Sequence, residues 1–308
     1  MSCFLICGGA KKANGGGKTE NGGLHVALPI FPLPFSLLRI LVNFLALMDK
    51  NPPRCVTFAS KQYAMKKHWW KGLAVLLVGY TIVAGLLADA PRLPILNETV
   101  RVLHFHVPMW FGMMGLFTVS VVYSIKYLRN PMHRNDVYAI EFANTGMLLG
   151  ILGILTGSLW ARFTWGTFWT SDPKLNAAAI ALLIYSAYFI LRGSLTDEQQ
   201  RARIGAIYNI FAFATLVPLL FILPRITDSL HPGNGGNPGF SSYDLDSQLR
   251  IVFYPAVIGW LLLGVWFTSL RIRLQAIKDT INERMEDAMF RANRPRPVDN
   301  PSTVERPV

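Results

Sequence analysis

Apolar and charged residues are separated into long blocks along most of this chain. Six runs contain no Asp, Glu, Lys or Arg, and they occupy residues 72–88, 103–125, 142–161, 175–191, 204–223 and 251–270. A helix that rises about 1.5 Å per residue needs about 20 apolar residues to cross a hydrocarbon layer of about 30 Å, and each run approaches or reaches that length. The pattern predicts an all-α integral membrane protein with a bundle of six transmembrane helices.

The overall composition supports this fold class. Hydrophobic residues make up 52% of the chain and charged residues only 16%, whereas a soluble domain carries about 25% charged residues. The formal charge of +12 would raise the possibility of nucleic-acid binding in a soluble protein. Here most basic residues flank the apolar runs and no nucleic-acid-binding motif accompanies them, so we expect no nucleic-acid partner.

The basic residues also predict an orientation in the membrane. Lys and Arg gather before the first run and after the second, fourth and sixth runs, at Lys61, Lys66, Lys67, Lys71, Lys126, Arg129, Arg134, Arg192, Arg201, Arg203, Arg271, Arg273 and Lys278. Connections rich in Lys and Arg stay in the cytoplasm. We therefore expect both ends of the core to be cytoplasmic, with the first, third and fifth connections together on the outer face.

Three regions follow from these patterns. Residues 1–64 are expected to be an N-terminal extension, either disordered or a mis-assigned start, because Pro29, Pro32 and Pro34 interrupt their apolar run. An additional membrane segment or a targeting signal is the alternative. Residues 65–273 form the predicted six-span domain, and residues 274–308 form a charged cytoplasmic tail. All three cysteines precede residue 56, which excludes disulfides and thiolate metal sites from the six-span domain.

The third connection concentrates aromatic residues. Between two apolar runs it carries Trp160, Phe163, Trp165, Phe168 and Trp169. Aromatic belts at a membrane surface are spread over many helix ends and rarely place five rings in one connection. We interpret this loop as a platform for a flat, apolar ligand.

Histidines on the same outer face suggest what that ligand is. His104 and His106 open the second run, and helical steps of about 100° place them on nearly opposite faces, so we expect one to address a site and the other to lie at the membrane interface. His231 stands in the fifth connection. Two neutral imidazoles beside a group of rings are what axial ligation of a haem iron requires.

Three charged residues fit the same hypothesis. Arg101 and Arg162 stand at the ends of runs, where a guanidinium could pair with the propionates of a haem, although snorkelling to lipid headgroups is the alternative. Asp172 immediately precedes Pro173 and the fourth run, a pattern that predicts a helix N-cap.

The aromatic loop and the first histidine element together resemble a known family. The segments Thr156-Gly-Ser-Leu-Trp160 and Trp165-Gly-Thr-Phe-Trp169-Thr-Ser-Asp172 resemble the tryptophan-rich WWD domain of haem-handling proteins. With Arg101-Val-Leu-His-Phe-His106-Val-Pro108 and six runs, residues 68–273 are similar to the CcmC family, the haem-handling membrane subunit of cytochrome c maturation system I.

The resemblance implies a ligand and a set of contacts. It implies a transiently and non-covalently bound haem b, with His106 and His231 as axial ligands of the iron. The residues that match the WWD signature would lie against the porphyrin, namely Trp165, Gly166, Thr167, Trp169 and Asp172. Phe168 and Ser171 stand where the family usually has Trp, and Lys174 and Asn176 stand where Arg and Thr are common. The resemblance therefore says least about contacts at those positions.

The resemblance also implies a role and partners. Members of the family lie in the bacterial inner membrane and present haem at its periplasmic face to the chaperone CcmE, together with CcmA, CcmB and CcmD. This is haem transfer and assembly rather than the work of a turnover enzyme.

Two other function classes remain open at this point. A haem b subunit of a quinone oxidoreductase would need histidine pairs within the spans, and a haem-free permease would use the aromatic loop to line an opening. A lyase-like relative of the CcsA or CcmF type would have more than six spans. The positions of the histidines and the number of runs favour the haem-presenting role.

Overall fold

The computed structural model describes residues 61–90, 96–231 and 245–293, and within these ranges all regular structure is helical. The expected N-terminal extension lies almost entirely outside the described residues, as does the end of the tail. Six long helices are α2 (Lys61–Leu87), α3 (Leu103–Arg129), α4 (His133–Trp165), α5 (Pro173–Ser194), α6 (Glu198–Val217) and α8 (Ser247–Ala292). The short elements are η2 (Asn97–Val102), the π-helical turn η3 (Pro218–Ile222) and α7 (Leu223–Ile226).

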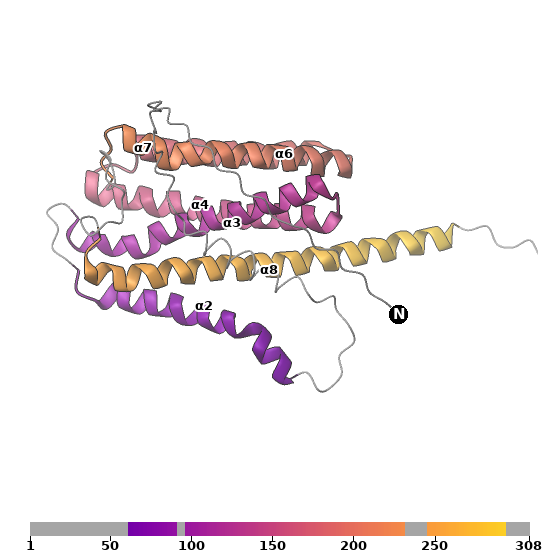
Figure 1. Cartoon of the computed structure of the whole chain (residues 1–308), viewed down its shortest axis with the longest axis horizontal. Helices are drawn as coiled ribbons and strands as arrows, with labels where there is room; N and C mark the ends of the chain where they lie inside the picture. Colours follow the sequence, from indigo (N-terminus) through magenta and orange to yellow (C-terminus); the bar gives the residue numbers. More distant parts are fainter. Residues whose placement is uncertain (1–60, 91–95, 232–244, 294–308) are drawn as a thin grey trace, which may run out of the picture. The chain divides into compact units, whose positions relative to one another are not determined.

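The predicted all-α membrane fold is confirmed. Six helices of the described part of the chain are long and apolar enough to cross a membrane. The second of these spans is longer than its apolar run, because η2 precedes α3 and the span covers Asn97–Arg129. Helix α8 continues past the other helices to Ala292 (Figure 1), so the first part of the charged tail is helical.

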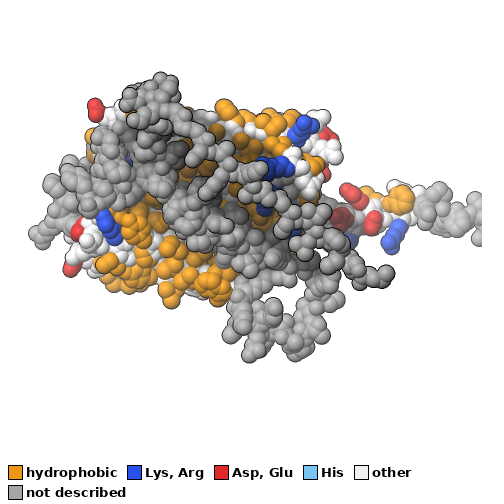
Figure 2. Space-filling model, viewed as in Figure 1, with side chains coloured by type: hydrophobic (Ala, Val, Ile, Leu, Met, Phe, Trp, Pro, Cys, Tyr) orange, Lys and Arg blue, Asp and Glu red, His pale blue; other side chains and the backbone are white. Residues whose placement is uncertain are grey.

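Helix α3 is the central element of the bundle. It packs against α4, α6 and α8, while α2 packs along α8 and α5 packs against α4 and α6 (Figure 1). On the face drawn in Figure 2, hydrophobic side chains cover the middle of the helices and charged side chains gather toward the ends. Successive helices run in opposite directions, so the ends of α2 and α4 meet the starts of α3, α5 and α8. We call this the aromatic end of the bundle.

A row of glycines on α4 lets α3 approach closely. Four large side chains of α3 lie over four glycines three or four residues apart, and a Cβ atom on any of these glycines would come within 2.6–2.9 Å of the side chain above it. Small residues at such spacing allow membrane helices to pack backbone to side chain. The pairs are His106 over Gly157, Trp110 over Gly153, Met113 over Gly150 and Phe117 over Gly146.

Buried polar pairs fix the opposite end of the bundle. The guanidinium of Arg192 on α5 donates two hydrogen bonds of 2.8 Å to the carboxylate of Asp136 on α4. Such a bidentate pair is directional and strong when it is shielded from water, and these side chains are only 9% and 14% exposed. Nearby, Asn209 of α6 donates to the hydroxyls of Ser120 and Ser124 on α3, at 2.7 and 2.8 Å.

A proline in α8 provides a contact for α2. Pro255 has no N–H, so the carbonyl of Ile251 lacks its usual helical donor. The hydroxyl of Tyr80 on α2 donates to this carbonyl at 3.5 Å. The contact joins the two helices near the aromatic end.

We expect Gly146→Ala to lower the stability of the protein. The added Cβ would lie 2.7 Å from the ring of Phe117, and that ring cannot easily move because it stacks on Tyr185 at a centroid distance of 3.7 Å. Overpacking of this kind costs about 1–3 kcal/mol. The matched control is Gly79→Ala on α2, where nothing lies within 4 Å and where alanine improves helix propensity. Thermal unfolding in detergent checks the pair, and a Gly146→Ala protein that melts no earlier than Gly79→Ala would contradict the packing argument.

Candidate functional site

The aromatic connection is shorter than the sequence suggested. Helix α4 continues through Trp165 because no helix breaker precedes Gly166, and only residues 166–172 connect it to α5. Gly166 has φ of 81°, a left-handed conformation that glycine adopts without the steric cost of a Cβ atom. Trp160 and Trp165 are therefore placed by a rigid helix rather than by a loop.

His106 is held between α3 and α4 with a defined orientation. Its Nδ1 lies 3.1 Å from the hydroxyl oxygen of Thr156, and that hydroxyl donates to the carbonyl of Leu152 at 2.8 Å. Because the hydroxyl proton of Thr156 is donated to Leu152, the Thr156 oxygen can only accept the hydrogen bond from His106. Nδ1 of His106 therefore carries the hydrogen. In this arrangement Nε2 keeps its lone pair and remains available to a ligand.

Two indole rings surround His106. Trp110 and Trp160 both meet its ring edge to face, with centroid distances of 6.3 and 5.9 Å. Trp160 is itself held by a hydrogen bond of 3.1 Å from its Nε1 to the hydroxyl of Thr99 in η2. The His106 side is thus a partly buried, aromatic environment.

His231 is held in a similar way by Asp172. Its Nδ1 lies 2.9 Å from Oδ1 of Asp172, and its ring meets Trp165 edge to face at 4.9 Å. A carboxylate accepts hydrogen bonds, so Nδ1 is again the protonated nitrogen and Nε2 is again available. The His231 side chain is 25% exposed.

Asp172 connects the start of α5 to residues 229–231 of the fifth connection. It is the N-cap of α5, as predicted, and accepts from the backbone N–H groups of Lys174 at 2.9 Å and Leu175 at 3.3 Å. Its second oxygen accepts from the hydroxyl of Ser229 at 2.9 Å and the backbone N–H of Leu230 at 2.7 Å. The Asp172 side chain is completely buried.

These contacts determine the charge of Asp172. Burial by itself raises the pKa of the carboxyl group, but the hydrogen bonds from His231, Leu230 and Ser229 together outweigh burial and hold the pKa well below its usual value. Asp172 is therefore ionised at neutral pH and provides a buried negative charge beside His231.

The structure brings the two histidines to the same end of the bundle. His106 contacts Trp160 and His231 contacts Trp165, and these indoles are separated by five residues of α4, or about 7.5 Å along the helix axis. The described residues contain no group of three or more His, Cys, Asp and Glu that could hold a metal ion, so the two imidazoles are not part of such a cluster.

The remaining aromatic residues of the connection face outward. Phe163, Phe168 and Trp169 are 72%, 58% and 44% exposed. Trp169 donates through Nε1 to the side chain of Asn176 at 3.2 Å, and its carbonyl accepts from the hydroxyl of Thr167 at 3.1 Å. The result is an exposed aromatic surface next to the histidine pair.

The two arginines named from the sequence are placed differently. Arg162 donates to the carbonyl of Gly166 and lies 5.9 Å from the Phe168 ring, within the aromatic connection. Arg101 donates to Glu98 at 2.8 Å and to the carbonyl of Ala88, at the end of α2. Arg101 is therefore engaged away from the histidine pair, and a contact with a propionate stays a prediction for both arginines.

The second histidine of this element packs against a different helix, and its expected position at the membrane interface stays a prediction. His104 is only 4% exposed, and its ring lies against Gly85 of α2. Because η2 precedes α3 within one continuous span, His104 lies between helices rather than at the exposed start of a helix.

Sequence reasoning named Asp172 but missed other residues that surround or support the two imidazoles. Thr156 and Ser229 were not singled out, and neither was Trp110. Thr156 precedes Trp160 by four residues and so shares its helix face, which is the signal that would have found it. For Ser229 the sequence offers only its position two residues before His231.

Comparison with known proteins identifies a family. The family model described as CcmC, Heme exporter protein C, matches residues 49–289. The chain is 28% identical over 232 residues to the Heme exporter protein C of Bradyrhizobium diazoefficiens, covering 74% of this chain and 84% of that protein. It is 24% identical over 207 residues to the protein of the same name from Haemophilus influenzae, covering 67% and 83%. The protein of that name from Escherichia coli K12 is 24% identical over 177 residues, covering 58% and 70%.

The family match spans well over half of the chain, including all six membrane-competent helices. The chain therefore belongs to the CcmC family of multi-pass membrane proteins.

Proposed function

We propose that this protein binds haem at its aromatic end and delivers it for cytochrome c maturation. The observation that carries the proposal is the pair of imidazoles at one end of the bundle, each with Nδ1 on an oxygen acceptor and Nε2 available. The printed name of its relatives, Heme exporter protein C, supports the same ligand.

His106 and His231 would be the axial ligands of the iron. A bound haem would supply an iron that two neutral imidazoles can ligate. Thr156 and Asp172 keep each ring in the tautomer that ligation needs, and such supporting hydrogen bonds raise the basicity of a ligating histidine. Asp172 is ionised, so His231 would be the stronger electron donor of the two.

The aromatic connection would provide the surface for the porphyrin. Trp165 and Trp169 offer broad apolar faces, while Gly166 has no side chain and Thr167 has a small one. Arg162 lies in the last turn of α4 beside the connection and could meet a propionate, while Arg101 would have to release the end of α2 to do so. We infer a transiently held haem b, because no cysteine of the six-span domain could bind it covalently.

We further propose the partners and the orientation. The distribution of Lys and Arg supports a position in the bacterial inner membrane, with the aromatic end in the periplasm and both ends of the core in the cytoplasm. The exposed rings of Phe163, Phe168 and Trp169 would meet the periplasmic chaperone CcmE. CcmA, CcmB and CcmD would act with this protein, as in the family it belongs to.

Replacing either histidine should abolish bis-histidine ligation. We expect the protein purified in detergent and loaded with haem to show a six-coordinate optical spectrum, and His106→Ala and His231→Ala each to lose it and to bind haem at least about tenfold more weakly. His133→Ala is the control, because His133 is 65% exposed and pairs with Asp279 on the tail helix. A six-coordinate spectrum in either alanine variant would show that the replaced histidine is not a ligand of the iron. Absence of haem from the unsubstituted protein would favour the permease, and reduction coupled to quinol would favour the oxidoreductase.

Asp172→Asn should separate the electrostatic role of this residue from its role as a helix cap. Asparagine keeps an oxygen that can cap α5, so we expect the helices to be retained, while its NH2 group cannot accept the hydrogen bond from the Leu230 N–H and should weaken that attachment. Loss of the buried negative charge should weaken electron donation by His231 and make the haem easier to reduce. A spectroelectrochemical titration checks this, with the melting temperature as a measure of the fold. A properly folded variant with an unchanged reduction potential would show that Asp172 does not act through His231.

The two tryptophans of the connection should differ in their tolerance of substitution. Trp169→Phe keeps an aromatic face, and we expect it to retain haem. Trp165→Ala removes a ring that contacts His231 and should lose much of the haem. Haem per protein after purification is the measurement, and equal retention by both variants would remove the stacking argument.

A further inference from the structure

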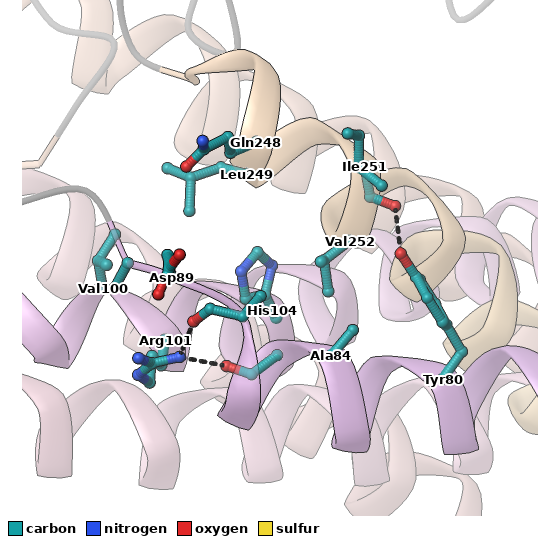
Figure 3. A pocket seen from close by; sticks show the side chains of 13 residues that line it. Tyr80, Ala84, Asp89, Val100, Arg101, His104, Gln248, Leu249, Ile251 and Val252 are labelled. Carbon is teal, nitrogen blue, oxygen red and sulfur yellow. Dashed lines mark hydrogen bonds between the residues drawn. The ribbon is translucent and has the colours of Figure 1, made fainter.

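A second pocket lies at the aromatic end, on the other side of α3 from His106. It has a volume of about 260 Å³ and is bounded by the end of α2, the start of α3 and the start of α8 (Figure 3). His104 and His106 are two residues apart, so a rotation of about 200° separates their side chains. One helix therefore presents one histidine to each site.

The floor of the pocket is apolar except for one nitrogen. Val100, His104, Leu249 and Val252 form it and are between 2% and 5% exposed. Among the residues that the structure describes, Nδ1 of His104 is buried and has no hydrogen-bond partner. The His104 imidazole lines the pocket, so a ligand atom that bonds to this ring would offset part of the cost of burying it.

The rim of the pocket indicates a neutral ligand group. Arg101 is already engaged by Glu98 and by carbonyl oxygens at the end of α2, which is the negative end of the helix dipole. Asp89 adds a further negative charge to the lining. These groups compensate the positive charge of the Arg101 guanidinium, so a free phosphate would bind there only weakly.

The size of the pocket indicates that only part of a molecule enters it. Sites for whole drug-sized ligands have volumes of about 300–1,000 Å³, which is larger than this pocket. Tyr80 and Ile251 line it and are 38% and 64% exposed, and on the same stretches of α2 and α8 Val83 and Tyr254 are 59% and 49% exposed. In a membrane-spanning helix such apolar side chains face lipid, so the rest of the ligand can lie along them.

We propose that this pocket binds the polar end of a membrane lipid that carries a neutral oxygen group, a carbonyl or a hydroxyl, with that oxygen bonded to the imidazole of His104. The apolar floor accommodates the body of the headgroup, and Gln248 at the rim offers an amide to a second oxygen. A quinone ring and an acylglycerol ester both have this chemistry. The assignment does not depend on haem binding at His106 and His231.

Direct binding measurements test this proposal. The full-length protein in detergent is titrated with a short-chain benzoquinone and, separately, with a short-chain diacylglycerol. We expect one of these probes to bind saturably, and its identity tells which lipid the pocket takes. His104→Leu should bind that probe about tenfold more weakly, which corresponds to one hydrogen bond.

Two further variants keep the test decisive. His104→Gln restores a hydrogen-bonding group and should recover most of the binding, which separates loss of the bond from loss of the fold. His106→Leu alters the opposite face of α3 and should keep the probe while losing haem. The proposal is overturned if neither probe saturates, if His104→Leu binds as well as the unsubstituted protein, if His106→Leu loses the probe, or if inorganic phosphate displaces it. If the pocket holds only water, neither probe will bind saturably.

Discussion

The candidate haem site depends on the buried carboxylate of Asp172. This single side chain caps α5, accepts from the backbone and hydroxyl of residues 229 and 230, and orients His231. Without it, the start of α5 would lose its cap, and the fifth connection would lose its attachment to the aromatic connection. A negative charge this deeply buried is sustained only because hydrogen-bond donors surround it, and the donors are the elements that the site has to hold together.

The second constraint is the row of glycines on α4. Because Gly157 has no side chain, His106 can lie directly on α4, next to the hydroxyl of Thr156 and the ring of Trp160. His106 is therefore fixed by rigid helix packing, whereas His231 is fixed by one carboxylate on a connection. The two imidazoles differ accordingly in the rigidity of their support, and the His231 side can more easily open for a ligand to enter or leave.

Much of this arrangement was predictable from the sequence, and the rest was not, for physical reasons. Hydropathy determines which segments span a membrane, and the charges between them bring His106, His231 and the aromatic connection to one end. The cap at Asp172 follows from a local signal. The burial of His104 and the engagement of Arg101 depend on how each helix is rotated about its axis, and the predominantly apolar runs carry little information about rotation.

The same lack of rotational information explains why the second pocket emerges only from the structure. On a mostly apolar helix the sequence says that His104 and His106 face opposite ways, but not which neighbours each one meets. The structure places α4 on the His106 side and the ends of α2 and α8 on the His104 side. Helix α3 thus separates an aromatic site with two available imidazole nitrogens from an apolar pocket with one. Because α3 packs tightly against α4 through the row of glycines, the same helix that fixes His106 on one side also fixes His104 on the other.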